Sequence, residues 1–242
     1  MSDAKATIQQ LRDSVCAVMK IKKGIIDKGV QQFQLGFVGT AWCIKADRYL
    51  VTAHHLLNEG KMRDPSDRFY AFTVPGNGLQ AFECPIVNFP LEDPSNDLAV
   101  LEIGRFISQN QHLSAVPVTF AHPADGTPVL TLGFPSPQIA NANVAPDGNY
   151  RGGQFFLKAH SNTGIVAAQY EAAGSWQFEF NVGWHHGESG GPITQLEPLG
   201  VFAVMQSYRN IVTPHGIVAG PHMGRALEVI KPQLVLYGAT VI

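Results

Sequence analysis

The sequence predicts an all-β fold built from two small barrels, and three observations lead to it. The chain has 242 residues, a length that suits one domain of two small β-barrels or two modest separate domains. It contains 24 glycines and 16 prolines, which favour many turns between short strands. Its hydrophobic fraction of 45% supplies enough apolar material for two cores.

The first half of the chain is predicted to start with a helix and continue as strands. Residues 3–13 fit a short helix with an N-cap at Ser2 or Asp3, and residues 15–21 fit a strand. The stretch 22–29, rich in lysine and glycine, indicates an exposed turn. Further strands are expected over 36–44, 49–53, 69–74, 79–88 and 98–103.

The second half is also predicted to be rich in strands. Polar residues 108–112 are expected to join the halves of one domain spanning 1–242, with an N-terminal barrel over about 14–112 and a C-terminal barrel and helix over about 113–242. Residues 136–153 are predicted to form a long loop. A helix is expected from Met223 through Ile230, and Pro232 should end or kink it. Strands are expected over 129–135, 154–159, 163–170, 175–182, 192–195, 199–207 and 214–220.

The stretch Gly187-Glu188-Ser189-Gly190-Gly191-Pro192 places a serine in a glycine-rich turn. A serine hydroxyl is nearly inert at neutral pH and needs a general base within hydrogen-bond reach. It also needs N–H groups directed at the oxygen that becomes negative in the tetrahedral intermediate, and glycine permits the backbone angles this requires. We therefore predict Ser189 as a nucleophile, with the N–H groups of Gly187 and Ser189 as its oxyanion hole.

Two adjacent histidines compete for the role of base. The apolar strand 50–53 runs directly into His54 and His55. Neighbouring residues at a strand end point to opposite sides, so only one of these two side chains can face a cleft.

Two aspartates compete for the carboxylate that fixes the tautomer of the base and stabilises its cation. Asp97 directly precedes the apolar strand 98–103, a position that suits partial burial, whereas Asp93 lies in a polar turn. Asp97 is therefore favoured. The resulting order along the chain is histidine, aspartate, serine.

This order resembles that of the chymotrypsin-type, or trypsin-like, serine peptidases, and within them the bacterial HtrA/Deg and staphylococcal glutamyl-endopeptidase groups. The resemblance covers about residues 14–234 and implies two six-stranded antiparallel Greek-key barrels with a short N-terminal helix and a C-terminal helix. Its Thr-Ala-x-His signature, matched by residues 52–55, implies His55 as the base. Weaker matches lie at 37–44, 131–135, 161–168 and from Gly216 onward.

The resemblance also implies a primary specificity pocket near the serine. No aspartate stands near Gly183, so a preference for Arg or Lys is disfavoured and an apolar or small side chain is expected. A pocket-facing histidine, among those at 185, 186, 215 and 222, would instead favour Glu or Asp. The expected pocket residues are Gly183, His186, Met205, Gln206, Ser207 and His215. The adjacent pair His185-His186 is too few ligands for zinc, and no metal or cofactor is predicted.

Glu188 departs from the pattern of the relatives. Secreted relatives have Asp before the serine, where a new N-terminal amine pairs with it, and HtrA-type relatives commonly have Asn. The N-terminus of this chain offers no Ile-Val-Gly-Gly-like activation site, so we expect no trypsin-style zymogen activation. We expect Glu188 to pair with a local cation or hydrogen-bond donor instead.

Charge and cysteine content disfavour several other classes. A formal net charge of −2 without a basic stripe argues against nucleic acid as a partner. No stretch approaches the roughly 20 apolar residues that a membrane span needs. The three cysteines, Cys16, Cys43 and Cys84, have no paired spacing, and Leu56 stands where secreted relatives have a cysteine. With an N-terminus that lacks an apolar run of signal-peptide length, these features predict a reducing, cytoplasmic setting.

We therefore predict a serine endopeptidase that hydrolyses peptide bonds of protein or peptide substrates through an acyl-enzyme. Ser189 is the predicted nucleophile, His55 the base and Asp97 the orienting carboxylate. One alternative is a latent protease, activated when a partner or ligand orders the oxyanion loop. Another is a binding or scaffold protein on a protease fold. The orientation of the peptide at Gly187 separates the latent form from the active one.

Overall fold

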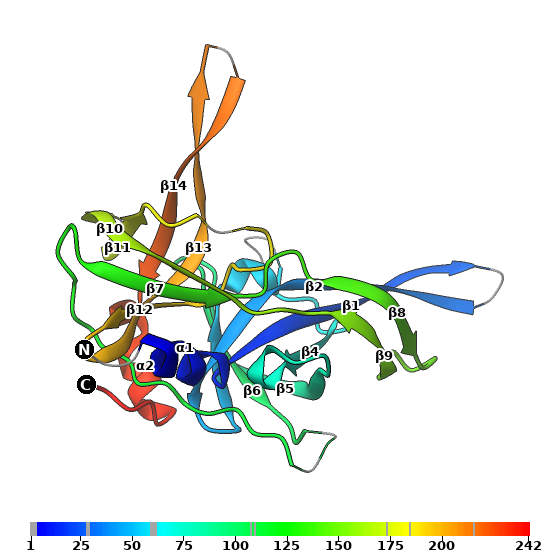
Figure 1. The fold of residues 1–242 in the computed structure, drawn as a ribbon. Helices are drawn as coiled ribbons and strands as arrows, with labels where there is room; N and C mark the ends of the chain where they lie inside the picture. Colours follow the sequence, from blue (N-terminus) through cyan, green and yellow to red (C-terminus); the bar gives the residue numbers. More distant parts are fainter. Residues whose placement is uncertain are drawn as a thin grey trace.

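Two closed barrels of six antiparallel strands each make up most of the part of the chain that the structure describes (Figure 1). The structure is a computed structural model, and it describes residues 4–27, 30–58, 62–106, 108, 110–172, 174–183, 185–214 and 216–242. The first barrel has the strand order β1-β2-β3-β6-β5-β4. Its strands are β1 (Val15–Asp27), β2 (Val30–Lys45), β3 (Tyr49–Thr52), β4 (Arg68–Thr73), β5 (Phe82–Asp93) and β6 (Leu98–Ile103).

The second barrel has the order β10-β11-β14-β13-β12-β7. Its strands are β7 (Pro128–Gly133), β10 (His160–Ala172), β11 (Ser175–Phe180), β12 (Pro192–Leu196), β13 (Leu199–Thr213) and β14 (Gly216–Ala226). The short helix α1 (Ala4–Arg12) precedes the first barrel, and α2 (Lys231–Leu236) follows the second. This architecture confirms the predicted fold class. The expected boundary between residues 112 and 113 falls in the stretch 104–127 that joins β6 to β7.

Alternating side chains of each strand enter different cores, because neighbouring residues of a strand face opposite sides. In β1, Cys16 and Val18 belong to a cluster with members from all six strands of the first barrel, so this cluster fills the barrel. Ala17 and Met19 belong to a second cluster, which collects residues from both barrels and from the helices. A third cluster around Phe178 fills the second barrel. The barrels are therefore packed internally and also packed against each other.

The three cysteines lie inside the first barrel and are free. Burial raises the pKa of Cys43 to about 12 and that of Cys84 to about 12. Burial also raises the pKa of Cys16 well above its usual value. Thiols in such surroundings stay protonated at neutral pH and are poor nucleophiles.

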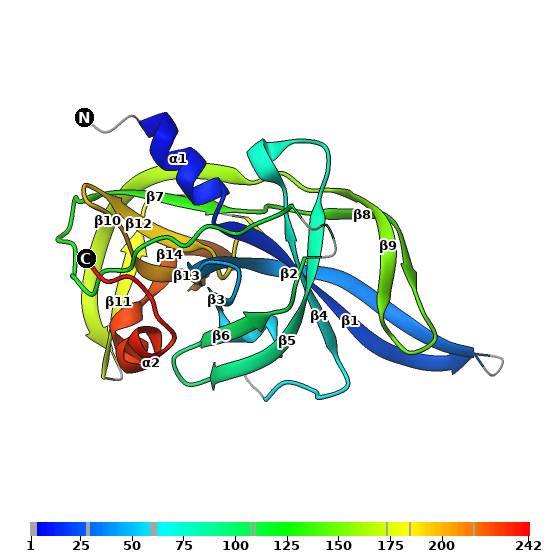
Figure 2. The same cartoon turned by 90° about the horizontal axis from the view of Figure 1, so that it is seen from below.

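The turn expected over 22–29 is largely a continuation of the sheet. β1 runs to Asp27 and β2 starts at Val30, and Lys22 pairs with Gln34 across the ribbon. The predicted turn was wrong over residues 22–27, because antiparallel pairing satisfies the backbone whatever the polarity of the side chains. Residues 28 and 29 lie outside the described residues. The β1–β2 ribbon therefore extends beyond the barrel (Figure 2).

The long loop expected over 136–153 is also wrong, because most of it forms a β-hairpin. β8 (Gln138–Val144) pairs with β9 (Tyr150–Phe156) in a separate two-stranded sheet. The ring centroid of Phe155 lies 5.3 Å from that of Phe37 and 5.0 Å from that of Phe72, and the Tyr150 N–H donates to the Tyr70 hydroxyl at 3.0 Å. These aromatic contacts fasten the hairpin to the first barrel, where both views place it (Figures 1 and 2).

The C-terminal helix exists but begins later than expected. Residues 223–226 belong to β14, where Met223 pairs with Glu179 of β11. A 3-10 turn (Leu227–Ile230) follows, and α2 has Pro232 in its first turn. Strand pairing overrides the helical spacing of the apolar residues, and a proline is tolerated at a helix start because the first N–H groups have no partner there. No helix in the described ranges is long and apolar enough to cross a bilayer.

Candidate active site

His55 and Asp97 are joined by two hydrogen bonds. A 3-10 turn (His54–Leu56) directly follows β3 and carries His55. The Nδ1 atom of His55 lies 2.8 Å from Asp97 Oδ2, and the backbone N–H of His55 donates to Asp97 Oδ1 at 2.7 Å. Asp97 itself has a left-handed φ of 56°, which turns the chain sharply into β6. With Nδ1–H donated to the carboxylate, Nε2 of the neutral ring is the acceptor.

Ser189 lies in the turn between β11 and β12, and the first barrel holds it in place. The Thr40 N–H of β2 donates to the Ser189 carbonyl at 2.8 Å. Gly190 has a φ of 86°, and a Cβ atom there would lie 2.2 Å from both the Thr40 carbonyl oxygen and Thr52 Oγ1, so only glycine fits. The Ser189 hydroxyl donates to the Gln206 carbonyl of β13 at 2.7 Å.

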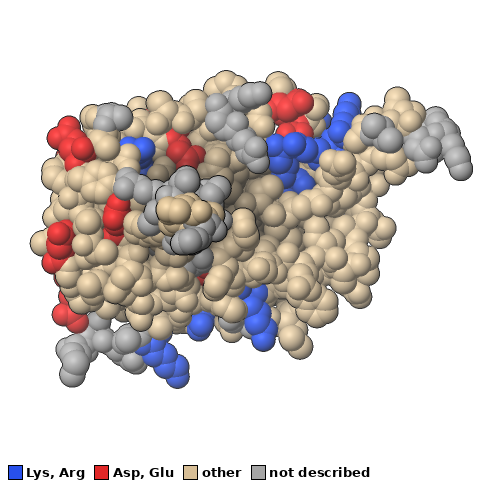
Figure 3. Space-filling model, turned by 90° about the horizontal axis from the view of Figure 1, so that it is seen from above, with Lys and Arg blue, Asp and Glu red and all other residues tan. Residues whose placement is uncertain are grey.

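The turn that carries His55 and the turn that carries Ser189 line the same cavity, which has a volume of about 700 Å³. His55 and Ser189 both line it, and so do His186 and Gly187 of the serine turn. Figure 3 looks onto a face of the molecule that is hollowed, with a group of Lys and Arg side chains beside the hollow. Its lining residues come from both barrels.

The peptide between His186 and Gly187 has a defined orientation. Its carbonyl, on His186, accepts a hydrogen bond from the Ser136 N–H at 2.7 Å. In a trans peptide the N–H points opposite to the carbonyl, so the Gly187 N–H points away from the segment that contains Ser136. Gly187 has a φ of 98°, and its own carbonyl accepts the Thr40 hydroxyl at 2.7 Å. Within the described residues, neither the Gly187 nor the Ser189 N–H donates to a protein group.

Glu188 is fully buried and accepts two hydrogen bonds. Asn162 Nδ2 donates to Oε1 at 2.9 Å, and the His185 N–H donates to Oε2. Gly133 makes room for it, since a Cβ atom there would lie 2.9 Å from Glu188 Cα. Loss of hydration on burial raises the pKa of Glu188 above its ordinary value. The partners of the Glu188 carboxylate are therefore two uncharged N–H donors. One of them, the His185 N–H, belongs to the turn that carries Gly187.

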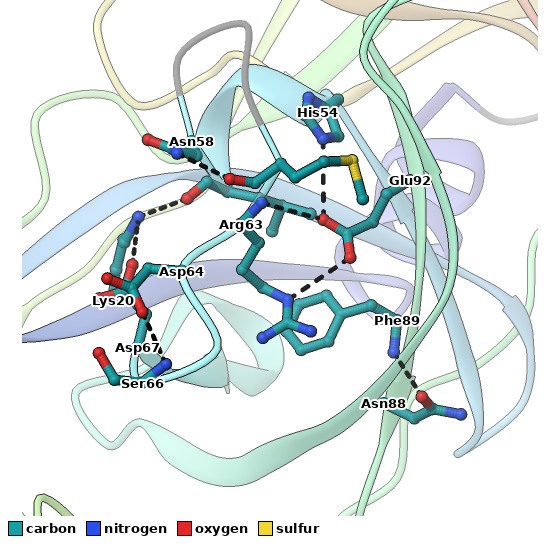
Figure 4. Close-up of polar contacts among 12 residues, drawn as sticks. Lys20, His54, Asn58, Arg63, Asp64, Ser66, Asp67, Asn88, Phe89 and Glu92 are labelled. Atoms are coloured by element: carbon teal, nitrogen blue, oxygen red, sulfur yellow. Dashed lines mark hydrogen bonds and ion pairs between the residues drawn. The ribbon is translucent and has the colours of Figure 1, made fainter.

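The alternatives to His55 and Asp97, which are His54 and Asp93, have different surroundings. His54 is 1% exposed, and its Nε2 atom lies 3.8 Å from a carboxylate oxygen of Glu92 (Figure 4). Arg63 approaches the same carboxylate at 3.6 Å and stacks over Phe89. Asp93 accepts the backbone N–H groups of residues 95 and 96 and so caps a turn. Neither group contacts the cavity.

The expected specificity pocket is only partly gathered at this cavity. His186, Gln206 and Ser207 line it together with the serine. Met205 is fully buried in the core of the second barrel, so its side chain does not reach the cavity, and Gly183 lies outside its lining. His215 lies outside the described residues. The described residues contain no group of three or more His, Cys, Asp or Glu side chains placed to bind a metal ion.

Two residues that hold the serine turn were not predicted from the sequence. Thr40 joins the barrels, since its hydroxyl donates to the Gly187 carbonyl and accepts the Phe134 N–H at 3.0 Å. Asn162 holds Glu188. A polar residue in an otherwise apolar strand was the available signal for Thr40, whereas Asn162 lies in the polar stretch 161–163 and carries no such signal.

Comparison with known proteins agrees with this geometry. The trypsin-like peptidase domain family matches residues 39–198. The chain belongs to the trypsin-like peptidase family. A solved structure of the HtrA-type protease AlgW with a decapeptide is similar to this chain, with a TM-score of 0.63 and 14% identity. The match covers 98% of this chain and 68% of the AlgW chain. A variant of the same protease, AlgWS227A with a decapeptide, matches equally well.

The crystal structure of Deg5 matches with a TM-score of 0.58 and 15% identity, covering 100% of this chain and 99% of that one. At these identities the solved structures show a shared fold. The family match confirms the resemblance to trypsin-like peptidases, and the fold is shared with these HtrA-type and Deg structures. No curated protein sequence matches the chain significantly.

Proposed function

We propose that this chain is a serine endopeptidase in which Ser189 is the nucleophile, His55 the base and Asp97 the orienting carboxylate. The observation that carries the proposal is that His55, which is joined to Asp97 by two hydrogen bonds, lines one cavity together with Ser189. Membership of the trypsin-like peptidase family supports it independently. The substrate is a protein or peptide, as the size and openness of the cavity suggest.

The reaction begins when the Ser189 hydroxyl leaves the Gln206 carbonyl and turns its proton towards His55 Nε2. The Ser189 oxygen then attacks the carbonyl carbon of the scissile peptide bond while His55 takes the proton. Asp97 stabilises the resulting imidazolium through Nδ1–H. The N–H groups of Gly187 and Ser189 stabilise the oxyanion, and loss of one such donor typically costs about 2.7–4 kcal/mol.

The tetrahedral intermediate collapses as the C–N bond breaks. His55 returns its proton to the leaving amine, which departs and leaves an acyl group on Ser189. Water then attacks the acyl carbon while His55 accepts one of its protons. A second collapse releases the carboxylic acid and returns the proton to Ser189.

The peptide orientation at Gly187 favours a constitutively active enzyme over a latent one. The His186 carbonyl is already bound to Ser136 N–H, which directs the Gly187 N–H away from that segment. Glu188 holds the same turn from its buried side without a new N-terminal amine. The scaffold alternative is disfavoured because all three residues with catalytic roles are present.

Labelling with a fluorophosphonate probe tests the proposal. The wild-type protein should be labelled, with the label on the peptide that contains Ser189 by mass spectrometry. Ser189→Ala should abolish labelling, whereas Ser114→Ala, at an exposed position that is not part of the cavity lining, should not. Labelling only after a peptide or partner is added would support the latent form. A well-folded wild-type protein that is never labelled would contradict both forms.

A further inference from the structure

The cavity wall on the His55 side belongs to the first barrel. Since the leaving amine takes its proton from His55, the residues that follow the scissile bond pass on this side of Ser189. The wall they meet consists of Lys20 and Lys22 of β1, Val38 of β2 and the segment 56–58 after His55. This step rests on the proposed function.

Strand geometry places the two lysines on one face of β1. They are two positions apart, so their side chains point to the same side of the strand. Ile21 between them is 1% exposed and packs in the core. Lys23 lies two positions after Ile21, so it points to the same side of the strand as Ile21, away from the cavity. There it lines a separate small pocket with Arg68. The ribbon thus presents Lys20 and Lys22, and not Lys23, to the substrate.

Lys20 is the buried lysine of this wall, and two partners hold its side chain in place. Its side chain is 8% exposed, its Nζ atom lies 2.7 Å from Asp67 Oδ2, and it donates to the Leu57 carbonyl (Figure 4). Pairing with a carboxylate is what allows an ammonium group to be buried while charged. An ammonium has three donors, and these two partners take two of them. Lys20 therefore fixes the wall and contributes a charge that Asp67 balances.

Lys22 is the exposed cation at the rim. Its side chain lies in solvent, and no carboxylate of the described residues is within 4.0 Å of its Nζ atom. Asp64 is the nearby acid; its pKa is lowered mainly by hydrogen bonds from Ser66 and further by the charges of Lys20 and Lys22. Lys22 is thus near a carboxylate without being paired to it.

The charged and titratable side chains that line the cavity are all basic. They are Lys20, Lys22, His55, His185 and His186. No Asp or Glu is among the described lining residues. Because Asp67 balances Lys20 and Asp97 is paired with His55, the charge that a substrate meets here comes chiefly from Lys22, which attracts a carboxylate and repels a lysine.

We propose that Lys22, on the wall fixed by Lys20, selects substrates with an acidic side chain at the first or second residue after the scissile bond. The preference concerns the leaving side of the substrate. It is separate from the side-chain pocket expected near His186, which would act on the residue before the bond.

Matched peptides test this inference. The set is based on one peptide that the enzyme cleaves, made as a quenched fluorescent substrate. Its three versions carry Ala, Glu or Lys at both of the first two positions after the scissile bond. For the wild-type enzyme, kcat/KM for the Glu peptide should exceed that for the Lys peptide by about 2–5-fold at low salt, the range of an exposed ion pair. The preference should shrink as salt screens the charges.

Charge reversal provides the decisive comparison. Lys22→Glu should reverse the Glu-over-Lys preference, whereas the adjacent Lys23→Glu should leave it unchanged, because Lys23 lies on the other face of the strand. Fluorophosphonate labelling verifies that each variant keeps a competent Ser189.

Each remaining outcome overturns the inference. It fails if a labelled, active wild-type enzyme shows no preference, or if Lys22→Glu keeps the wild-type preference. It also fails if Lys23→Glu shifts the preference as much as Lys22→Glu, since the effect would then belong to the general field. These outcomes leave the proposed function intact, whereas a wild-type protein that neither labels nor cleaves any peptide removes both.

Discussion

The turn that carries His55 and the turn that carries Ser189 are held in different ways. His55 and Asp97 are half-exposed, with side chains 33% and 26% accessible, and two short hydrogen bonds between them suffice. The serine turn depends on a buried carboxylate, on two glycines with positive φ and on bonds from Thr40 in the other barrel. His55 is thus oriented locally, whereas Ser189 is oriented by contacts that come from both barrels.

This difference implies that the two halves fail differently. A substitution at the base half removes one chemical group and leaves its surroundings in place. A substitution at the serine half removes a support for the N–H groups that we propose as oxyanion donors, so activity and stability should change together. The following predictions separate these behaviours.

Asp97→Asn should give the largest effect. The amide cannot stabilise the imidazolium and favours the wrong tautomer of His55, so we expect kcat to fall by about 10⁴-fold. The free energy of unfolding should change little. The control is Asp93→Asn on the same loop, which caps a turn without contacting His55. Steady-state kinetics measures kcat of both variants, and urea unfolding measures their free energies of unfolding. A loss below tenfold in kcat of Asp97→Asn would contradict the role of Asp97.

Gly187→Ala should lower kcat by about 10²–10³-fold, the cost of one oxyanion donor. A Cβ atom at Gly187 would lie 2.2 Å from the Phe134 carbonyl oxygen, and its φ of 98° disfavours any other residue. The turn must therefore shift. Gly36→Ala is the control, since nothing lies within 4 Å of a Cβ atom there. Unchanged kcat in Gly187→Ala would show that this N–H does not bind the oxyanion.

Glu188→Gln should lower kcat/KM by about tenfold at neutral pH, because one of two buried N–H donors then faces an amide N–H₂ instead of a carboxylate oxygen. The variant should also change the pH dependence. As pH falls through the raised pKa of Glu188, protonation puts an O–H against an N–H donor, so wild-type activity should decline there. In a profile of kcat/KM against pH, Glu188→Gln should lack the decline that protonation of Glu188 causes in the wild type.

The same carboxylate makes a stability prediction of defined sign. Burial raises the pKa of Glu188 in the folded state, so the folded protein holds this proton more tightly than the unfolded chain does. The Glu188 contribution to the free energy of unfolding should therefore fall as pH rises from the ordinary Glu pKa through the raised one. Urea unfolding across this window should show that slope in the wild type and not in Glu188→Gln. Equal slopes would contradict the ionisation of Glu188.

Thr40→Val should give the smallest kinetic effect. It removes the hydroxyl that bonds the Gly187 carbonyl and the Phe134 N–H, and each unpaired buried group costs about 1–3 kcal/mol. Thr194→Val is the matched control, because its buried hydroxyl bonds Leu130 within the second barrel. Both variants should be destabilised in urea, and only Thr40→Val should also lose kcat. If kcat of Thr40→Val equalled that of Thr194→Val, Thr40 would not support the serine turn.

Local patterns predicted the elements well where strand pairing and local preference agree. The barrel strands and the N-terminal helix follow from alternation, turn residues and helical spacing. The prediction failed where pairing at a distance decides the conformation. Residues 136–153 are polar and look like a loop, yet Phe155 packs on Phe37 and Phe72 and the segment becomes a hairpin. Residues 223–226 have helical spacing, yet β11 and β13 hold them as a strand.

The sequence by itself determined the two-barrel class, the order histidine, aspartate, serine and the conspicuous glutamate beside the serine, because these depend on residue type and short-range pattern. Only the tertiary structure decided that His55 faces Asp97 while His54 is buried near Glu92. It also decided that Glu188 is held by Asn162 and His185, and that Lys20 and Lys22 line the cavity. The physical reason is that hydrogen bonds and burial depend on which distant strands come together, and no local pattern of side chains records that pairing.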